Sequence, residues 1–200
     1  MIPITKNPPH RCAWCMVKPP LDRLYQAYHD TEWGKPNFND RDLFAMLCLE
    51  GMQAGLSWIT ILQKRQNYYR AFLDFDPNLI AKFDNNTVDR LMQNDGIVRH
   101  RGKIEAIINN AKAYLAITKT QSFSDYLWQM SPNFVENHQK QPLVNHFAHE
   151  SEIPTKTVYA DAMAKQLKKD GFKFVGATTC YAFMQAVGMV NDHVIACDFR

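Results

Sequence analysis

The chain has 200 residues, of which 46% are hydrophobic, and it carries 23 basic and 20 acidic residues. This is an ordinary size for one domain with a substantial apolar core, and no second core is required. A net charge of +3 is too small to indicate a polyanionic partner without support from particular basic segments.

The longest uncharged stretch, 174–191, contains two glycines and several polar side chains, which favours a buried helix over a membrane span. The N-terminus is proline-rich and polar, without the apolar segment of a signal peptide. We therefore expect a cytoplasmic protein with no membrane contact. In that reducing compartment, five cysteines are expected to be free thiols or metal ligands rather than disulfides.

Helical patterns follow one another along the chain after residues 1–11, which we interpret as a loose lead-in to a single helical domain, 12–200. A first helix is predicted with Asp40 as its cap, and a second begins at Trp58 with Ser57 as its cap. Asp76 and Pro77 open another helix, because proline is tolerated in a first turn.

The second half of the chain continues this pattern. A short helix is expected from residue 86 or 87 to Met92, and a longer one spans 104–115. The later helices are expected to follow Ser122 or Ser124, Thr157 and Thr178, and the expected terminators are Gly171 and Gly188. Residues 132–154 lack a regular pattern, and alternating strand patterns are nearly absent. The predicted fold class is all-α.

Glu50 stands where helical spacing calls for an apolar residue. It shares a helical face with Leu43, Leu47 and other apolar residues. An unpaired carboxylate in a core costs several kcal/mol, roughly, so it needs a local partner or a ligand. Trp58 follows after a glycine-containing break, and a carboxylate facing a large aromatic suits a flat, cationic or electron-poor ligand with N–H donors. The alternative is a core glutamate bonded to a backbone amide or a tyrosine.

Soft metal ligands stand near both ends of the chain. Cys12, Cys15 and His29 lie near the start, and His193 and Cys197 lie near the end in an H-x3-C spacing. Four of them would form a closed tetrahedral zinc site that joins the two ends. The chemistry leaves two sets open, in which either Cys15 or His29 accompanies the other three ligands. Unrelated thiols and surface histidines are the alternative.

A basic, glycine-bounded connection between two predicted helices includes Arg99, Arg101, Gly102 and Lys103. The amides of Gly102 and Lys103, at the opening of the second helix, could bind a phosphate with help from the basic side chains. A simple turn between two antiparallel helices would use a glycine in the same way, so the pattern alone does not decide.

Aromatic residues gather before Glu50, and they belong to longer blocks that carry a resemblance. The aromatic residues are Trp14, Tyr25, Tyr28 and Trp33. The blocks are RCAWC, AYHDTEWG, CLEGMQAGLSWITILQKR, GIVRHRGKI, GFKFVG and VNDHVIAC. Through these blocks the chain resembles the 3-methyladenine DNA glycosylase I family, from Arg11 to Cys197.

The resemblance implies a helix-hairpin-helix fold and excision of 3-methyladenine from alkylated double-stranded DNA, with the free base as product. It also implies one structural zinc ion per chain, and it selects Cys12, His29, His193 and Cys197 as the ligands. Cys15 then departs from the family pattern, as do the lead-in and the very short tail after Cys197. We expect a monomer.

The resemblance also implies roles for the site residues. Trp58 would stack on the flipped base, and Glu50 would accept hydrogen bonds from the base edge. Gly55 and Leu56 would face the duplex, with Leu56 as an apolar wedge. The residues implied to form the other walls of the pocket are Tyr28, Trp14, Trp33 and Tyr25. Those implied to hold the DNA backbone are Arg99, Arg101, Gly102 and Lys103.

Two other functions compete with this one. A non-catalytic, zinc-stapled helix-hairpin-helix module that binds nucleic acid would explain the basic connection, but it leaves Glu50 without a purpose. A zinc-dependent hydrolase would need an open coordination position. Asp125, the nearest candidate for a water-activating aspartate, is more simply interpreted as a favourable charge at a helix start.

Overall fold

The structure is a computed structural model that describes residues 8–200. Residues 1–7, most of the predicted lead-in, lie outside the described residues, and the boundary at residue 12 stays a prediction. The end of the lead-in is held to the rest of the chain. The His10 N–H donates to the Asp198 carboxylate at 2.9 Å, and the Arg11 guanidinium donates to Asp30 at 2.7 Å.

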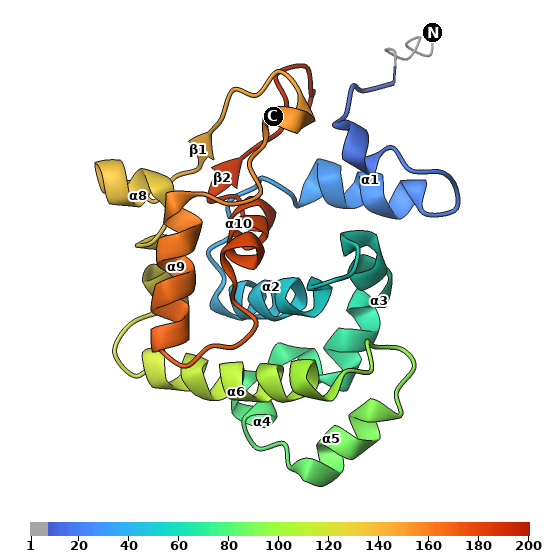
Figure 1. Cartoon of the computed structure of the whole chain (residues 1–200), viewed down its shortest axis with the longest axis vertical. Helices are drawn as coiled ribbons and strands as arrows, with labels where there is room; N and C mark the ends of the chain where they lie inside the picture. The colour runs from blue at the N-terminus through green and yellow to red at the C-terminus, as the bar shows by residue number, and fades with distance from the viewer. Residues whose placement is uncertain (1–7) are drawn as a thin grey trace, which may run out of the picture.

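The described chain is mostly helical (Figure 1). Its α-helices are α1 (Asp22–Thr31), α2 (Asp40–Gln53), α3 (Trp58–Ala71), α4 (Pro77–Ile80), α5 (Asn85–Met92), α6 (Arg101–Ile117), α7 (Phe123–Trp128), α8 (Pro132–Asn137), α9 (Val158–Lys169) and α10 (Ala177–Ala186). The shorter elements are the 3-10 helices η1 (Ala13–Cys15), η2 (Leu73–Phe75) and η3 (Glu150–Glu152), and the strands β1 (Leu143–Val144) and β2 (Val190–Asn191). Within residues 8–200, every helix is too short or too polar to cross a membrane.

Side-chain caps explain where several helices begin. Asp76, Ser122 and Thr157 accept a hydrogen bond from an amide of the helix that follows each of them, as expected. The cap of α2 is Asn39, not Asp40 as predicted. Asp40 instead accepts the N–H groups of Phe123 and Ser124, at 3.0 and 2.8 Å, so it connects α2 to the start of α7.

The fold departs from the prediction in other places as well. Helix α5 begins at Asn85 with Asp84 as its cap, and α10 begins at Ala177 after Gly176 rather than after Thr178. Helix α1 was not predicted at all. The fold is mostly helical, as predicted, but β1 and β2 form a short parallel pair in which Leu143 lies opposite Val190. The segment 132–154 contains α8, β1 and η3 rather than irregular chain alone. Strands of two residues and helices of one or two turns are too short for a periodic pattern to reveal them. This reason does not apply to α1, which spans ten residues.

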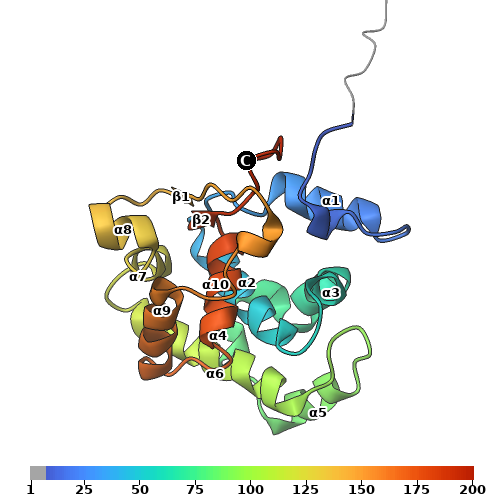
Figure 2. The same cartoon turned by 45° about the horizontal axis from the view of Figure 1, so that its top comes forward.

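Helix α2 runs through the middle of the molecule, with α3, α6 and α10 around it (Figures 1 and 2). Its residues Leu43, Phe44, Leu47 and Cys48 are each at most 1% exposed. A helix surrounded in this way is apolar on nearly all sides, so Glu50 on it lies in the core. The segment of η1 and α1 and the C-terminal end lie on the same side of the molecule (Figure 2).

Gly188 ends α10 as predicted, and no other residue would fit there. It adopts a left-handed φ of +69°, and a Cβ atom on it would lie 2.2 Å from the main-chain carbon of Lys35. This close approach places the segment after α10 against the segment after α1. It therefore brings β2 and His193 towards His29.

Candidate active site and metal centre

A cavity of about 340 Å³ lies among α1, α2, α3 and α10. Such a volume lies within the range of ligand-binding sites in proteins, about 300–1,000 Å³. Glu50 and all five aromatic residues expected in the pocket line this cavity, and they are Trp14, Tyr25, Tyr28, Trp33 and Trp58. The remaining lining residues, which the sequence analysis missed, are Gln53, Glu150, Ile153, Ala182 and Gln185. Among these missed residues, only Ala182 and Gln185 carry a sequence signal, because their i, i+3 spacing places them on the same face of a helix.

The aromatic side chains pack against one another and form a continuous wall. The Trp14 ring centre lies 4.9 Å from that of Tyr25 and 5.1 Å from that of Trp33, both edge to face. Tyr28 meets Trp58 at 5.4 Å in a tilted arrangement. These are favourable aromatic geometries, so the rings of the wall support one another.

Glu50 is only 4% exposed, and within the described chain its Oε2 atom has no hydrogen-bond partner. The alternative of a core glutamate bonded to an amide or a tyrosine is therefore not what the structure shows. Burial raises the pKa of Glu50 from its ordinary value of 4.5 to about 8. The indole N–H groups of Trp14 and Trp58 are also buried without a partner. Three buried polar atoms at one cavity, each without a partner in the described chain, are thus available to bind a polar ligand.

A second cavity of about 250 Å³ shares Glu50, Gln53 and Ala182 with the first. Its other lining residues are Ala54, Gly55, Leu56, Thr178 and Thr179. Leu56 is 42% exposed, and Gly55 has a φ of +78° with open space where a side chain would point. The loop between α2 and α3 thus forms the rim of an opening that leads to Glu50.

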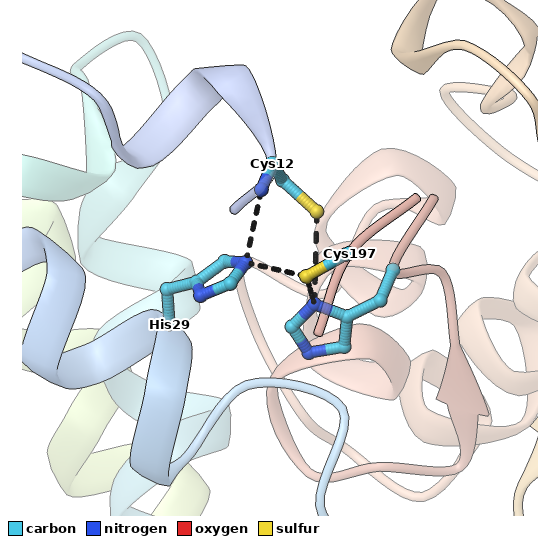
Figure 3. Close-up of side chains that lie close together, drawn as sticks. Cys12, His29 and Cys197 are labelled. Atoms are coloured by element: carbon cyan, nitrogen blue, oxygen red, sulfur yellow. Dashed lines mark hydrogen bonds between the residues drawn. The ribbon is translucent and has the colours of Figure 1, made fainter. Parts of the chain in front are cut away.

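Four ligand atoms from the two ends of the chain meet at one point. The side chains of Cys12, His29, His193 and Cys197 are all buried, and their ligand atoms lie within 4.8 Å of one another. Cys197 Sγ lies 3.5 Å from His29 Nε2 and 3.3 Å from His193 Nδ1. Figure 3 shows Cys12, His29 and Cys197 pointing towards a common centre. This group could hold a metal ion.

The surroundings fix which ring nitrogens face the centre. His29 Nδ1 lies 2.8 Å from an Asp30 carboxylate oxygen, and His193 Nε2 lies 3.1 Å from the main-chain oxygen of Trp33. Both partners are acceptors, so each of these nitrogens carries the proton, and the lone pair of the other nitrogen faces the centre, where a metal could bind it. Cys15 points away, because its thiol donates to the Cys12 carbonyl at 3.2 Å. Of the two sets left open by the sequence, the structure assembles the one with His29.

The residues of the predicted DNA-contacting connection have different environments. Arg99 is exposed, and Gly102 is partly exposed at the start of α6. The exposed Arg101 pairs with Asp89, and with Glu105 at 3.7 Å. The connection 93–100 joins α5 to α6, but its assignment to the helix-hairpin-helix type stays a prediction.

Lys103 does not lie where the sequence analysis expected it. Its side chain was expected to hold the DNA backbone, but the residue is only 5% exposed. The ammonium group donates to the main-chain oxygens of Met52 and Ala54, at 2.7 Å each. Burial lowers the pKa of Lys103. Its amide is also used, since His100 caps α6 by accepting from it at 3.2 Å. Lys103 is therefore not free to bind a phosphate.

Asp125 pairs with Lys140 at the start of α7. It lines neither of the two cavities. Its position agrees with the simpler interpretation of a favourable charge at a helix start.

Comparisons with known proteins show the family of the chain. A family model described as methyladenine glycosylase matches residues 14–200. DNA-3-methyladenine glycosylase 1 of Escherichia coli (strain K12) is 54% identical over 188 residues, which are 94% of this chain and 95% of that protein. A crystal structure of a 3-methyladenine DNA glycosylase I matches with a TM-score of 0.87 and 52% identity, over 94% of this chain and 98% of that chain. A structure of 3-methyladenine DNA glycosylase I from Staphylococcus aureus, described as showing the basis of 3-methyladenine recognition, matches with a TM-score of 0.86 and 38% identity, over 94% and 95% of the two chains. The chain belongs to the methyladenine glycosylase family.

Proposed function

We propose that this protein excises 3-methyladenine from alkylated double-stranded DNA, as the first step of base excision repair. It hydrolyses the bond between the base and its sugar and releases the free base. The observation that carries the proposal is the Glu50 carboxyl group, buried in an aromatic-walled cavity with an unpaired oxygen. The membership of the chain in the methyladenine glycosylase family supports the same reaction.

Methylation of N3 gives the adenine ring a positive charge in DNA. When the bond from the ring to C1′ breaks, its electron pair stays on the base, which leaves as a neutral molecule. Water supplies the oxygen that bonds to C1′ and loses a proton. Because the leaving group is already activated, strong acid catalysis is not needed, and the task of the enzyme is to select and position the base.

Glu50 provides the selection. With a pKa of about 8, its carboxyl group holds a proton near neutral pH before a base binds. A cationic base that donates N–H groups favours the ionised carboxylate, and such charge-assisted hydrogen bonds are stronger than those between neutral groups. Unmethylated adenine carries no charge, so its binding does not offset the free-energy cost of burying an ionised carboxylate.

The aromatic wall holds the plane of the base. Trp58 supplies a face for stacking, and Tyr28, Trp14, Trp33 and Tyr25 enclose the other sides of the cavity. Gly55 and Leu56 lie at the opening that leads to Glu50, where Leu56 can enter the base stack as the nucleotide leaves it. Arg99, Arg101 and the start of α6 at Gly102 are proposed to contact phosphates.

We further propose that one zinc ion joins the two ends of the chain through Cys12, His29, His193 and Cys197. Two thiolates and two imidazoles are a typical donor set for structural zinc, and the second ring nitrogen of each histidine is already hydrogen-bonded. A bound zinc would complete a closed centre without a position for substrate. The protein is proposed to act as a monomer with one domain over 12–200. It is proposed to work in the cytoplasm, because its substrate is cellular DNA.

The test is release of base from methylated duplex DNA, followed by chromatography of the free base. The wild-type protein should release 3-methyladenine, and a chelator should abolish release together with folding. Retention of alkylated DNA without any released base would support the non-catalytic binding module instead. Rapid loss of activity without loss of folded structure on chelation would support the zinc-dependent hydrolase.

A further inference from the structure

The buried ammonium group of Lys103 holds the end of the helix that carries Glu50. Lys103 comes from the first turn of α6, and its two acceptors, the oxygens of Met52 and Ala54, lie at the end of α2 and in the loop after it. These carbonyls belong to the C-terminal end of a helix, where carbonyl oxygens lack partners and the helix dipole favours a cation. Within residues 8–200, no other side chain donates to either oxygen.

The loop that follows α2 is a tight turn of defined type. The Leu56 N–H donates to the Gln53 carbonyl at 2.6 Å. Ala54 has φ −42° and ψ 114°, and Gly55 has φ +78°. These angles are those of a type II turn, which requires a glycine at the position of Gly55. A type I turn differs mainly by a flip of the peptide between Ala54 and Gly55.

Lys103 binds the carbonyl of that same peptide, so it fixes the direction of the flip. A trans peptide directs its N–H opposite to its C=O. The Gly55 N–H therefore points away from Lys103, and within the described chain it has no hydrogen-bond partner. Both Gly55 and Leu56 are exposed at the rim of the second cavity.

We propose that Lys103 is a positioning residue for base extraction, which holds the turn 53–56 in the form that presents Gly55 and Leu56 to the duplex. This inference rests on the proposed function. The hydrogen bonds of Lys103 make the start of α6 and the turn 53–56 one rigid unit, so that contact of α6 with the DNA backbone sets the position of Leu56. The role differs from phosphate binding, because the ammonium group never contacts DNA.

The experiment compares Lys103→Met, which keeps the stem of the side chain and removes the donors, with Lys103→Arg, which keeps the charge and donors. Lys112→Met is the matched control, because it removes one charge from an exposed position on the same helix. Three quantities are measured for each variant: affinity for free 3-methyladenine, salt dependence of binding to undamaged duplex, and the single-turnover rate of base release.

We expect Lys103→Met to bind the free base within about twofold of wild type and to show the salt slope of Lys112→Met. Its single-turnover rate should fall about ten- to a hundredfold, since hydrogen bonds to charged groups are lost, and Lys103→Arg should recover part of it. Gly55→Ala should lower the rate similarly. Its effect should not add to that of Lys103→Met, because both change one turn.

A folded Lys103→Met protein that releases base at the wild-type rate would overturn the inference, and so would equal losses in free-base binding and release. If Lys103→Met does not fold, Lys103→Gln replaces it under the same criteria. Failure of both to fold would make Lys103 a residue of global stability and would also overturn it. Failure of the proposed function itself is distinguished by the wild-type protein, which would then release no base.

Discussion

The main-chain oxygen of Trp33 accepts a hydrogen bond from Nε2 of His193 at 3.1 Å, while the Trp33 indole lines the cavity that contains Glu50. One residue thus belongs to both the metal-ligand group and the proposed base pocket. Trp14 also connects the pocket to the metal-ligand group, because it lies two residues after Cys12 and packs edge to face on the His29 ring at 5.2 Å. A metal ion at the centre would therefore hold the pocket wall as well as the chain ends.

The first prediction concerns the metal ligands. His29→Ala should lose the zinc ion and lower the free energy of unfolding by about 4 kcal/mol or more, because metal binding contributes directly to folding. Cys15→Ser should keep the metal, because the Cys15 thiol only donates to the Cys12 carbonyl. Elemental analysis and urea denaturation of the purified proteins check both statements. A protein without zinc, or loss of zinc from Cys15→Ser, would contradict the assignment.

The second prediction concerns selection of the base. Glu50→Gln keeps the side-chain volume but replaces a carboxyl group that can ionise when the base binds by a neutral amide with one acceptor oxygen. We expect a folded protein that binds free 3-methyladenine about ten- to a hundredfold more weakly, because a charge-assisted hydrogen bond is lost. Calorimetric titration measures this, with Glu150→Gln at the same cavity as the control for a change of carboxylate alone. Undiminished binding by Glu50→Gln would remove Glu50 from the recognition of the base.

The third prediction is a dependence of stability on pH. The pKa of Glu50 is about 8 in the folded protein, above its ordinary value of 4.5, so between these values the folded state holds a proton that the unfolded state releases. The contribution of this bound proton to the free energy of unfolding is fully present below pH 4.5 and is lost as pH rises towards 8. Relative to wild type, Glu50→Gln should gain up to about 1.4 kcal/mol per pH unit in this window. Urea denaturation of both proteins at pH 6, 7 and 8 tests it. A constant difference would show that Glu50 has an ordinary pKa.

The fourth prediction concerns the DNA backbone. Arg99→Ala and Arg101→Ala should each weaken binding to any duplex sequence and reduce the salt slope by about one. Arg101 must exchange Asp89 for a phosphate. Asp89→Asn should therefore strengthen binding modestly, because it frees the guanidinium and removes a repelling charge. Titrations at several salt concentrations measure the slope. An unchanged slope in both arginine variants would mean that these side chains are only solvated.

Much of the secondary structure of this protein could be predicted from local sequence patterns. Periodicity located α2, α3 and α6, because an amphipathic or buried helix repeats within a few residues of itself. The caps Asp76, Ser122 and Thr157 act on amides only two or three residues away, so their effect is also local. Glu50 was found in the same way, as one charge on an otherwise apolar face.

Contacts between distant segments were decided only by the tertiary structure. The residue pattern alone left two ligand sets open, one with Cys15, favoured by the C-x2-C spacing, and one with His29, and only the family resemblance selected His29. The contact of His29 with Cys197 depends on how α1 packs against a segment more than 160 residues later. Lys103 shows this most clearly. A lysine in a basic segment looks the same in the sequence whether its side chain faces solvent or, as here, binds the end of a helix 51 residues away. The physical reason is that burial and hydrogen-bond partners are set by packing across the chain. The sequence therefore determined most of the helices, the family resemblance and the buried carboxylate, and the tertiary structure decided which side chains meet.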